Sequence, residues 1–165
     1  MNFNPLLWLQ CGILTLTVTP ALAQSTSAQD LEPTCKAAIF DIERNIENYR
    51  RAYVSNVSVY DIQTDADLPT ETPLNLLIGL DAYDSQGEGD VVSQSSALDI
   101  LESPQMLLNY SEKIIDRCKN IVSVNFLLTE YQSRQFGWVN GSVRKFRCAD
   151  SATTSELPWG SRMCF

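Results

Sequence analysis

Four cysteines that follow an apolar N-terminal segment, in a chain with no histidine, constrain this sequence most. They are Cys35, Cys118, Cys148 and Cys164. An even number of cysteines in a small exported domain usually forms disulfides. A zinc site is disfavoured, because no C-x-x-C spacing occurs and histidine ligands are absent. We therefore expect two disulfides, whose pairing the cysteine positions alone leave open.

The N-terminal segment has the pattern of a secretory signal peptide. An apolar run, residues 6–18, precedes Pro20 and the small residues Ala21 and Ala23 that a signal peptidase requires. Cleavage after Ala23 would leave a polar linker, residues 24–29, and one domain, residues 30–165. An uncleaved membrane anchor is the alternative, since the apolar segment is almost long enough to span a bilayer. We expect cleavage, no membrane span in the exported chain, and a location in the periplasm, the thylakoid lumen or the extracellular space.

The charge is acidic overall and unevenly placed. The 20 acidic side chains outnumber the 12 basic ones, for a net charge of −8, which argues against nucleic acid and anionic membranes as partners. Residues 61–102 form an acidic stretch without any lysine or arginine, which we expect to be largely irregular. Residues 113–147 are net basic, and we expect the two regions to neutralise each other across the fold.

Apolar residues at helical spacing predict two principal helices. The first begins near Pro33 and the second at Ser103-Pro104, where a capping residue precedes a first-turn proline. A short helical piece over residues 96–101 precedes the second. Cys35 and Cys118 each lie on the apolar stripe of one helix. Packing of these stripes would bring the two sulfurs together, so we expect a Cys35–Cys118 bridge, with Cys148 tied to Cys164.

The pattern changes to alternation from Ile121 onward, which is typical of a strand. Asn140-Gly141 is a strong hairpin signal, and a two-residue turn there pairs Trp138 with Val143 and Phe136 with Lys145. Residues 54–62 are compatible with a strand or a continued helix, and residues 68–90 read as irregular. The predicted fold class is α+β: two main helices on one face of a three-stranded antiparallel meander, with two disulfides.

Two segments near the C-terminus carry a resemblance. Residues 111–126 (SEKIIDRCKNIVSVNF) and 136–148 (FGWVNGSVRKFRC) resemble small exported cyanobacterial proteins of unknown function. Those proteins have a similar helix, a cysteine, a valine-rich strand and a glycine hairpin that ends in phenylalanine and cysteine. The resemblance covers the C-terminal third of the chain. It implies an exported compartment and transfers no catalytic residue.

No set of residues assembles a familiar active site. The absence of histidine excludes Ser-His-Asp triads, Cys-His dyads and histidine general bases. Ser142 and Lys145 match S-x-x-K, but an offset of three in a strand places them on opposite faces. We predict no catalytic residue. Trp159, between Pro158 and Gly160, is the aromatic side chain expected to be exposed for binding.

The acidic loop at residues 81–90 is the candidate metal site. Its oxygen ligands, Asp81, Asp84, Glu88 and Asp90, and its glycines have the chemistry that calcium prefers. However, the twelfth position counted from Asp84 is Ser95, where an EF-hand requires a bidentate glutamate. We expect a solvated loop, with calcium binding as the alternative.

These observations favour a non-catalytic exported module that binds a protein or an envelope component. Two alternatives remain open. One is a small hydrolase that uses paired carboxylates, since two acids far apart in sequence can meet in the fold. The other is a calcium-responsive accessory protein.

Overall fold

The computed structural model describes residues 31–62, 64, 66–81, 91–129, 132–149 and 157–162. The expected signal peptide, residues 1–23, and linker, residues 24–29, lie outside the described residues. Within the described ranges, no helix is both long enough and apolar enough to cross a membrane.

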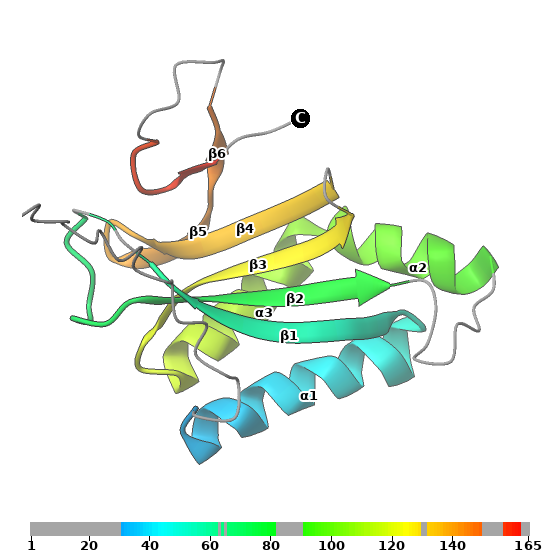
Figure 1. Cartoon of the computed structure of the whole chain (residues 1–165). Helices are drawn as coiled ribbons and strands as arrows, with labels where there is room; N and C mark the ends of the chain where they lie inside the picture. Colours follow the sequence, from blue (N-terminus) through cyan, green and yellow to red (C-terminus); the bar gives the residue numbers. More distant parts are fainter. Residues whose placement is uncertain are drawn as a thin grey trace, which may run out of the picture.

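Five strands form one mixed sheet in the order β1-β2-β3-β4-β5. Strand β2 pairs in parallel with β3, and the other neighbouring pairs are antiparallel. A separate parallel pair, β6–β7, follows the main sheet, and Figure 1 shows β6 beyond the β4–β5 edge. The strands are β1 (Tyr53–Asp61), β2 (Leu74–Asp81), β3 (Ile121–Thr129), β4 (Gln132–Val139), β5 (Ser142–Lys145), β6 (Arg147–Cys148) and β7 (Ser161–Arg162).

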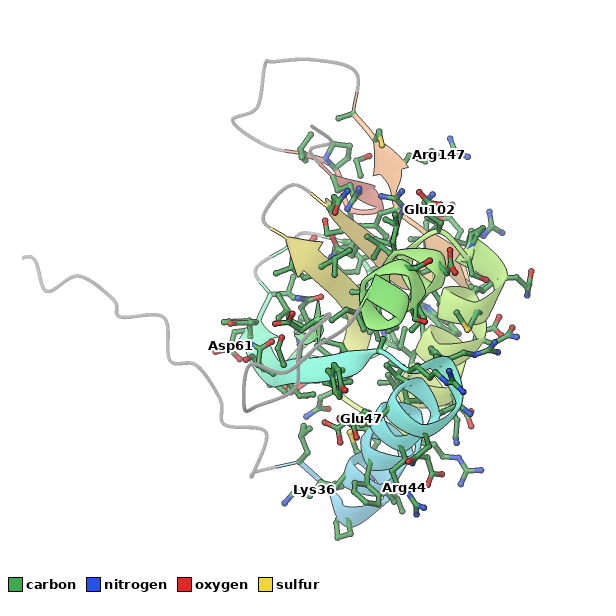
Figure 2. The ribbon with its side chains drawn as sticks, turned by 90° about the vertical axis from the view of Figure 1, so that its right-hand side faces the viewer. Lys36, Arg44, Glu47, Asp61, Glu102 and Arg147 are labelled. Carbon is green, nitrogen blue, oxygen red and sulfur yellow. A yellow bond between two sulfur atoms is a disulfide. The ribbon has the colours of Figure 1, made fainter. Side chains whose placement is uncertain are left out.

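Three helices lie along one face of the sheet: α1 (Pro33–Arg50), α2 (Val91–Leu101) and α3 (Pro104–Arg117) (Figures 1 and 2). Helices α2 and α3 belong to the crossover that makes the β2–β3 pair parallel. The core lies between helices and sheet, because alternate residues of each inner strand point toward the helices. On β2 these are Leu74, Leu76, Ile78 and Leu80, all buried.

The predicted three-stranded antiparallel meander with two helices is therefore wrong. The predicted meander strands exist as β3, β4 and β5, but β1 and β2 extend the sheet and β3 pairs with β2 in parallel. The helical piece expected at 96–101 is a full helix, α2. Residues 61–102 thus contain a strand and a helix rather than a largely irregular stretch.

Strand β2 was not predicted, and for residues 54–62, most of β1, a strand was one of two alternatives; both strands have weak sequence signals for physical reasons. Strand β2 lies between two neighbours and is at least half-buried throughout, so its sequence LNLLIGLD is an almost continuous apolar run without clear alternation. Strand β1 has a bulge between Val54 and Asn56. The bulge allows Val54 and Val57, three residues apart, both to pack against the core.

Locally encoded elements were predicted correctly. The hairpin has the expected register, with Trp138 opposite Val143 and Phe136 opposite Lys145. Its turn residues have positive φ, 51° at Asn140 and 81° at Gly141, as a type I′ turn requires. Helix α1 begins at Pro33, and α3 begins at the residue after Ser103.

The Cys35–Cys118 disulfide is confirmed, with the two Cα atoms 4.6 Å apart. It joins the first turn of α1 to the C-cap of α3, and each cysteine is 2% exposed. Of the two predicted bridges, the structure describes one in full, Cys35–Cys118. Cys148 is also disulfide-bonded, while Cys164 lies outside the described residues.

Polar contacts add to the covalent link between α1 and α3. The Tyr110 hydroxyl donates a hydrogen bond to Asn45 Oδ1. Lys113 Nζ lies 3.1 Å from Asp41 Oδ2. Just after α3, Lys119 Nζ lies 3.3 Å from Glu32 Oε1. Because these ion pairs are exposed, they stabilise the contact between α1 and α3 less than packing and the disulfide do.

One carboxylate on α1 opposes folding at neutral pH. Burial, and then the charge of Glu47 one turn away, raise the pKa of the Glu43 carboxyl above 4.5. The native state therefore binds this proton more tightly than the unfolded state. Stability contributed by Glu43 is lost as the pH rises from 4.5 through the raised pKa.

We expect Glu43→Gln to stabilise the protein at pH 7, first because a half-buried carboxylate becomes neutral and second because a like-charge repulsion of about 0.2–0.5 kcal/mol is removed. Thermal unfolding at pH 7 and again below pH 4.5 would measure the effect, which should fade at the acidic pH. Glu47→Gln is the matched control and should gain less, because it removes the repulsion but leaves Glu43 buried. An equal gain at both pH values would contradict this account.

Candidate functional site

The candidate site is a groove of about 470 Å³ between α3 and the β4–β5 hairpin, here called the hairpin groove. The hairpin supplies one wall, and the exposed side of α3 supplies the other. Its lining residues are Pro69, Glu112, Ile115, Asp116, Lys119, Ile121, Trp138, Ser142 and Val143.

The apolar surface of the groove follows from the hairpin register. Trp138 lies opposite Val143, and both side chains point to the helix side of the sheet, as Phe136 does. Phe136 is buried in the core, whereas Trp138, closer to the turn, is only half-buried. Ile115, on α3, packs partly against the core from the other wall. Part of the Trp138 side chain therefore remains exposed in the groove, where a ligand can contact it.

The rim of the groove is acidic. Glu112 and Asp116 are one helical turn apart on α3, so they share one face, and both are exposed. Asp116 Oδ2 lies 3.6 Å from Arg117 Nε, and Lys119, the one cation among the described lining residues, is paired with Glu32. Glu112 forms no ion pair with any residue in the described part of the chain.

Strand β5 presents free backbone groups beside this groove. It is an edge strand, and no other described strand pairs with its outer side. In a hairpin with a two-residue turn, Val139 and Ser142 form a hydrogen-bonded pair and the next pair does not. The N–H and C=O groups of Val143 and Lys145 consequently point away from β4, where an added strand would meet them.

The groove arrangement suits binding better than hydrolysis. Among the described residues, Glu112 and Asp116 are the carboxylates that line the groove, and both lie open to solvent. A carboxyl group that acts as an acid catalyst at neutral pH is normally enclosed in an apolar pocket. The groove therefore lacks the enclosure that the paired-carboxylate hypothesis requires.

Trp159 was expected to be an exposed aromatic, but the structure places it against the sheet. Its Nε1 donates a hydrogen bond of 2.8 Å to the Trp138 carbonyl oxygen. Its ring meets Phe146 edge to face, with centroids 5.0 Å apart. Phe146 in turn lies over Gly137, on the face opposite the helices. Half-buried Trp159 thus helps to cover that face rather than offering a free binding surface.

Of the four predicted calcium ligands, Asp81 is the one that the structure describes. Asp81 ends β2, while Asp84, Glu88 and Asp90 lie outside the described residues. No group of three or more metal-ligating side chains occurs among the residues that are described. In the S-x-x-K match, the Ser142 hydroxyl accepts a hydrogen bond from Arg144 Nε at 2.9 Å, and Lys145 is on the other face.

Sequence reasoning missed the groove although it placed both walls. The one-turn spacing of Glu112 and Asp116 on the polar side of a predicted helix was visible. So was the position of Trp138 next to the hairpin turn. What could not be predicted was that α3 packs beside β5, since that depends on the strand order of the whole sheet.

Comparison with known proteins identifies no relative: no protein-family model, curated protein or solved structure matches the chain. The resemblance of residues 111–126 and 136–148 to exported cyanobacterial proteins stays a prediction.

Proposed function

We propose that this chain is a non-catalytic exported module that binds an extended segment of a partner protein in the hairpin groove. The observation that carries the proposal is the half-buried Trp138, which forms an apolar surface inside a groove next to an unpaired strand edge. Aromatic side chains of this kind supply much of the energy in protein interfaces.

The backbone of β5 supports an extended ligand. An added strand would form hydrogen bonds with the outward N–H and C=O groups of Val143 and Lys145. Alternate side chains of that strand would then point into the groove, toward Trp138 and Ile115. The strand edge, through backbone hydrogen bonds, and the groove, through side-chain contacts, therefore both favour an extended peptide segment.

Charge complementarity defines the sequence of the segment. An apolar side chain would fill the space beside Trp138, and a neighbouring lysine or arginine would approach Glu112. Since the whole chain carries a net charge of −8, a basic segment is also attracted at long range. The proposed occupant is thus a partner segment with a basic residue next to an apolar one.

Selection from a phage-displayed library of random peptides, with the exported chain as bait, tests the proposal. We expect enriched peptides to combine a lysine or arginine with an apolar residue. The enriched peptides would then be synthesised with a fluorescent label, and their Kd would be measured by anisotropy. Trp138→Ala should weaken binding about tenfold, and Glu112→Gln should weaken it about threefold.

Asp99→Asn is the matched control, because it removes an exposed carboxylate on α2, outside the groove. It should leave the Kd unchanged. Enrichment of acidic peptides, no enrichment at all, or equal binding by the Trp138→Ala variant would each overturn the proposal. Glu112→Gln changes only an exposed side chain, so its result is not confounded by misfolding.

A further inference from the structure

Basic residues are concentrated at the C-terminal end of the described fold. Every charged residue in the described ranges 132–149 and 157–162 is a lysine or an arginine. Figure 2 shows one of them, Arg147, at the opposite end of the molecule from Lys36 and Arg44 of α1. This is a local excess of positive charge in a chain that is acidic overall.

The expected neutralisation of residues 113–147 by the acidic residues 61–102 is not seen in the ion pairs of the described residues. Lys113 and Lys119 pair instead with carboxylates at α1, Asp41 and Glu32. By contrast, Arg134, Lys145 and Arg162 form no ion pair with any carboxylate in the described part of the chain. We call these three residues the β4-edge cation cluster.

Ser133 is the point where two of these cations converge. Arg162 Nη1 donates a hydrogen bond of 2.7 Å to the Ser133 hydroxyl. Arg134 Nη1 donates one of 2.9 Å to the Ser133 carbonyl oxygen. Two guanidinium groups, from β7 and β4, are thus held at one serine, and neither pairs with a carboxylate among the residues that the structure describes.

Lys145 joins the cluster through the strand register. It lies opposite Phe136, and Arg134 is two residues before Phe136 on the same face of β4. After Lys145, the Phe146 N–H donates to the Gln135 carbonyl, and the chain then leaves the main sheet for β6. The cations therefore gather where the edge of β4 is no longer covered by β5.

Within the described ranges, the cluster has no anionic partner. The Nε of Arg162 is enclosed and has no hydrogen-bond acceptor among the described residues. Burial, and then the charges of Arg134 and Arg162, lower the pKa of Lys145. Burial, and then Arg134, lower the pKa of Arg162. An anion placed among these groups would offset the repulsion and supply acceptors.

We propose that the β4-edge cation cluster binds a small oxyanion, a phosphate or sulfate group. Two guanidinium forks and one ammonium match the several oxygens and double charge of such a group better than a single carboxylate. A long polyanion is disfavoured, because the net charge of −8 repels it away from this site. None of the three cations lines the hairpin groove, so this proposal does not depend on the proposed function.

Titration of the exported, ¹⁵N-labelled chain with inorganic phosphate, and separately with inorganic sulfate, tests this inference by NMR. Sodium chloride at equal ionic strength is the reference, and acetate tests whether a carboxylate suffices. We expect the arginine Nε–H signals of Arg134 and Arg162 to shift and saturate with phosphate or sulfate, but not with chloride or acetate. Shifts no larger than those with chloride would overturn the proposal.

Variants separate a specific site from general charge screening. Lys145→Gln should weaken phosphate binding about tenfold, the loss typical of one charged contact. Arg144→Gln is the matched control on the same strand and should leave binding unchanged, since Arg144 is bonded to Ser142. Because Lys145 is exposed, its replacement leaves the packing of β6 and β7 intact. Equal losses in both variants would contradict a defined site.

A last arm distinguishes the source of the anion. Vesicles of phosphatidylglycerol in phosphatidylcholine present the phosphate group on a surface, whereas inorganic phosphate presents it alone. We expect binding of free phosphate and no sedimentation of the protein with the vesicles. Sedimentation without any response to free phosphate would overturn the small-ion site in favour of a lipid surface.

Discussion

Replacement of both Cys35 and Cys118 by alanine should lower the free energy of unfolding by about 4.5 kcal/mol. The bridge spans 83 residues of sequence, and the chain-entropy model assigns that stabilisation to a loop of this length. The loop contains α1, β1, β2, α2 and α3, so without the bridge the unfolded chain gains freedom over most of the helical layer. A change this large is comparable to the whole stability of many domains.

Chemical denaturation of the wild-type and double-alanine chains, followed by circular dichroism, would measure the loss. Asp41→Asn is the matched control: it breaks the exposed Lys113–Asp41 pair, which joins the same two helices without a covalent bond. That variant should lose less than about 1 kcal/mol. If the double-alanine protein lost no more than the control, the disulfide would not be a main constraint on the fold.

The elements predicted correctly from the sequence are those fixed by local signals. Pro33 and Ser103-Pro104 define helix starts through backbone geometry, and Asn140-Gly141 defines a turn that fixes the register on both sides. The Cys35–Cys118 pairing followed because each cysteine lies on the apolar stripe of its own helix. Such inferences need only the neighbouring residues or the packing of two stripes.

The parallel pairing of β2 with β3 could not be predicted from such local signals. It depends on contacts such as Leu76 with Val124, far apart in sequence, and on the crossover through α2 and α3. Nothing in the run LNLLIGLD distinguishes a buried strand from a short buried helical segment. Because β2 was missed, the predicted sheet lacked its first two strands, and the remaining three resembled a simple meander.

The same difference between local and long-range information applies to the two candidate sites. The residues of the hairpin groove and of the β4-edge cation cluster are visible in the sequence, but their grouping is not. Arg162, on β7, reaches Ser133 near the start of β4 only because the chain returns there after β6. A charge count along the chain gave a net basic region, and the structure divides it into cations that pair with described carboxylates and cations that do not.

The second substitution with a large expected effect on stability is at Gly137, on the face of the sheet opposite the helices. Gly137 lies on that face beneath Phe146, where an added Cβ would lie 2.6 Å from Phe146 Cε1 and 3.0 Å from Ser123 Cβ. Neither neighbour has free space, since Phe146 is 3% exposed and Ser123 is fully buried. We expect Gly137→Ala to lower the free energy of unfolding by about 1–3 kcal/mol, the usual cost of overpacking.

A double-mutant cycle with Phe146→Ala identifies the cause. If the clash with the ring is responsible, Gly137→Ala should cost much less in the Phe146→Ala background, because the ring is no longer there to be displaced. Tryptophan fluorescence adds an independent readout, since Trp159 contacts Phe146 and should change its environment when the ring moves. Equal costs in both backgrounds would place the strain at Ser123 instead. In that case β3 and β4, rather than the C-terminal aromatic pair, would limit the space at Gly137.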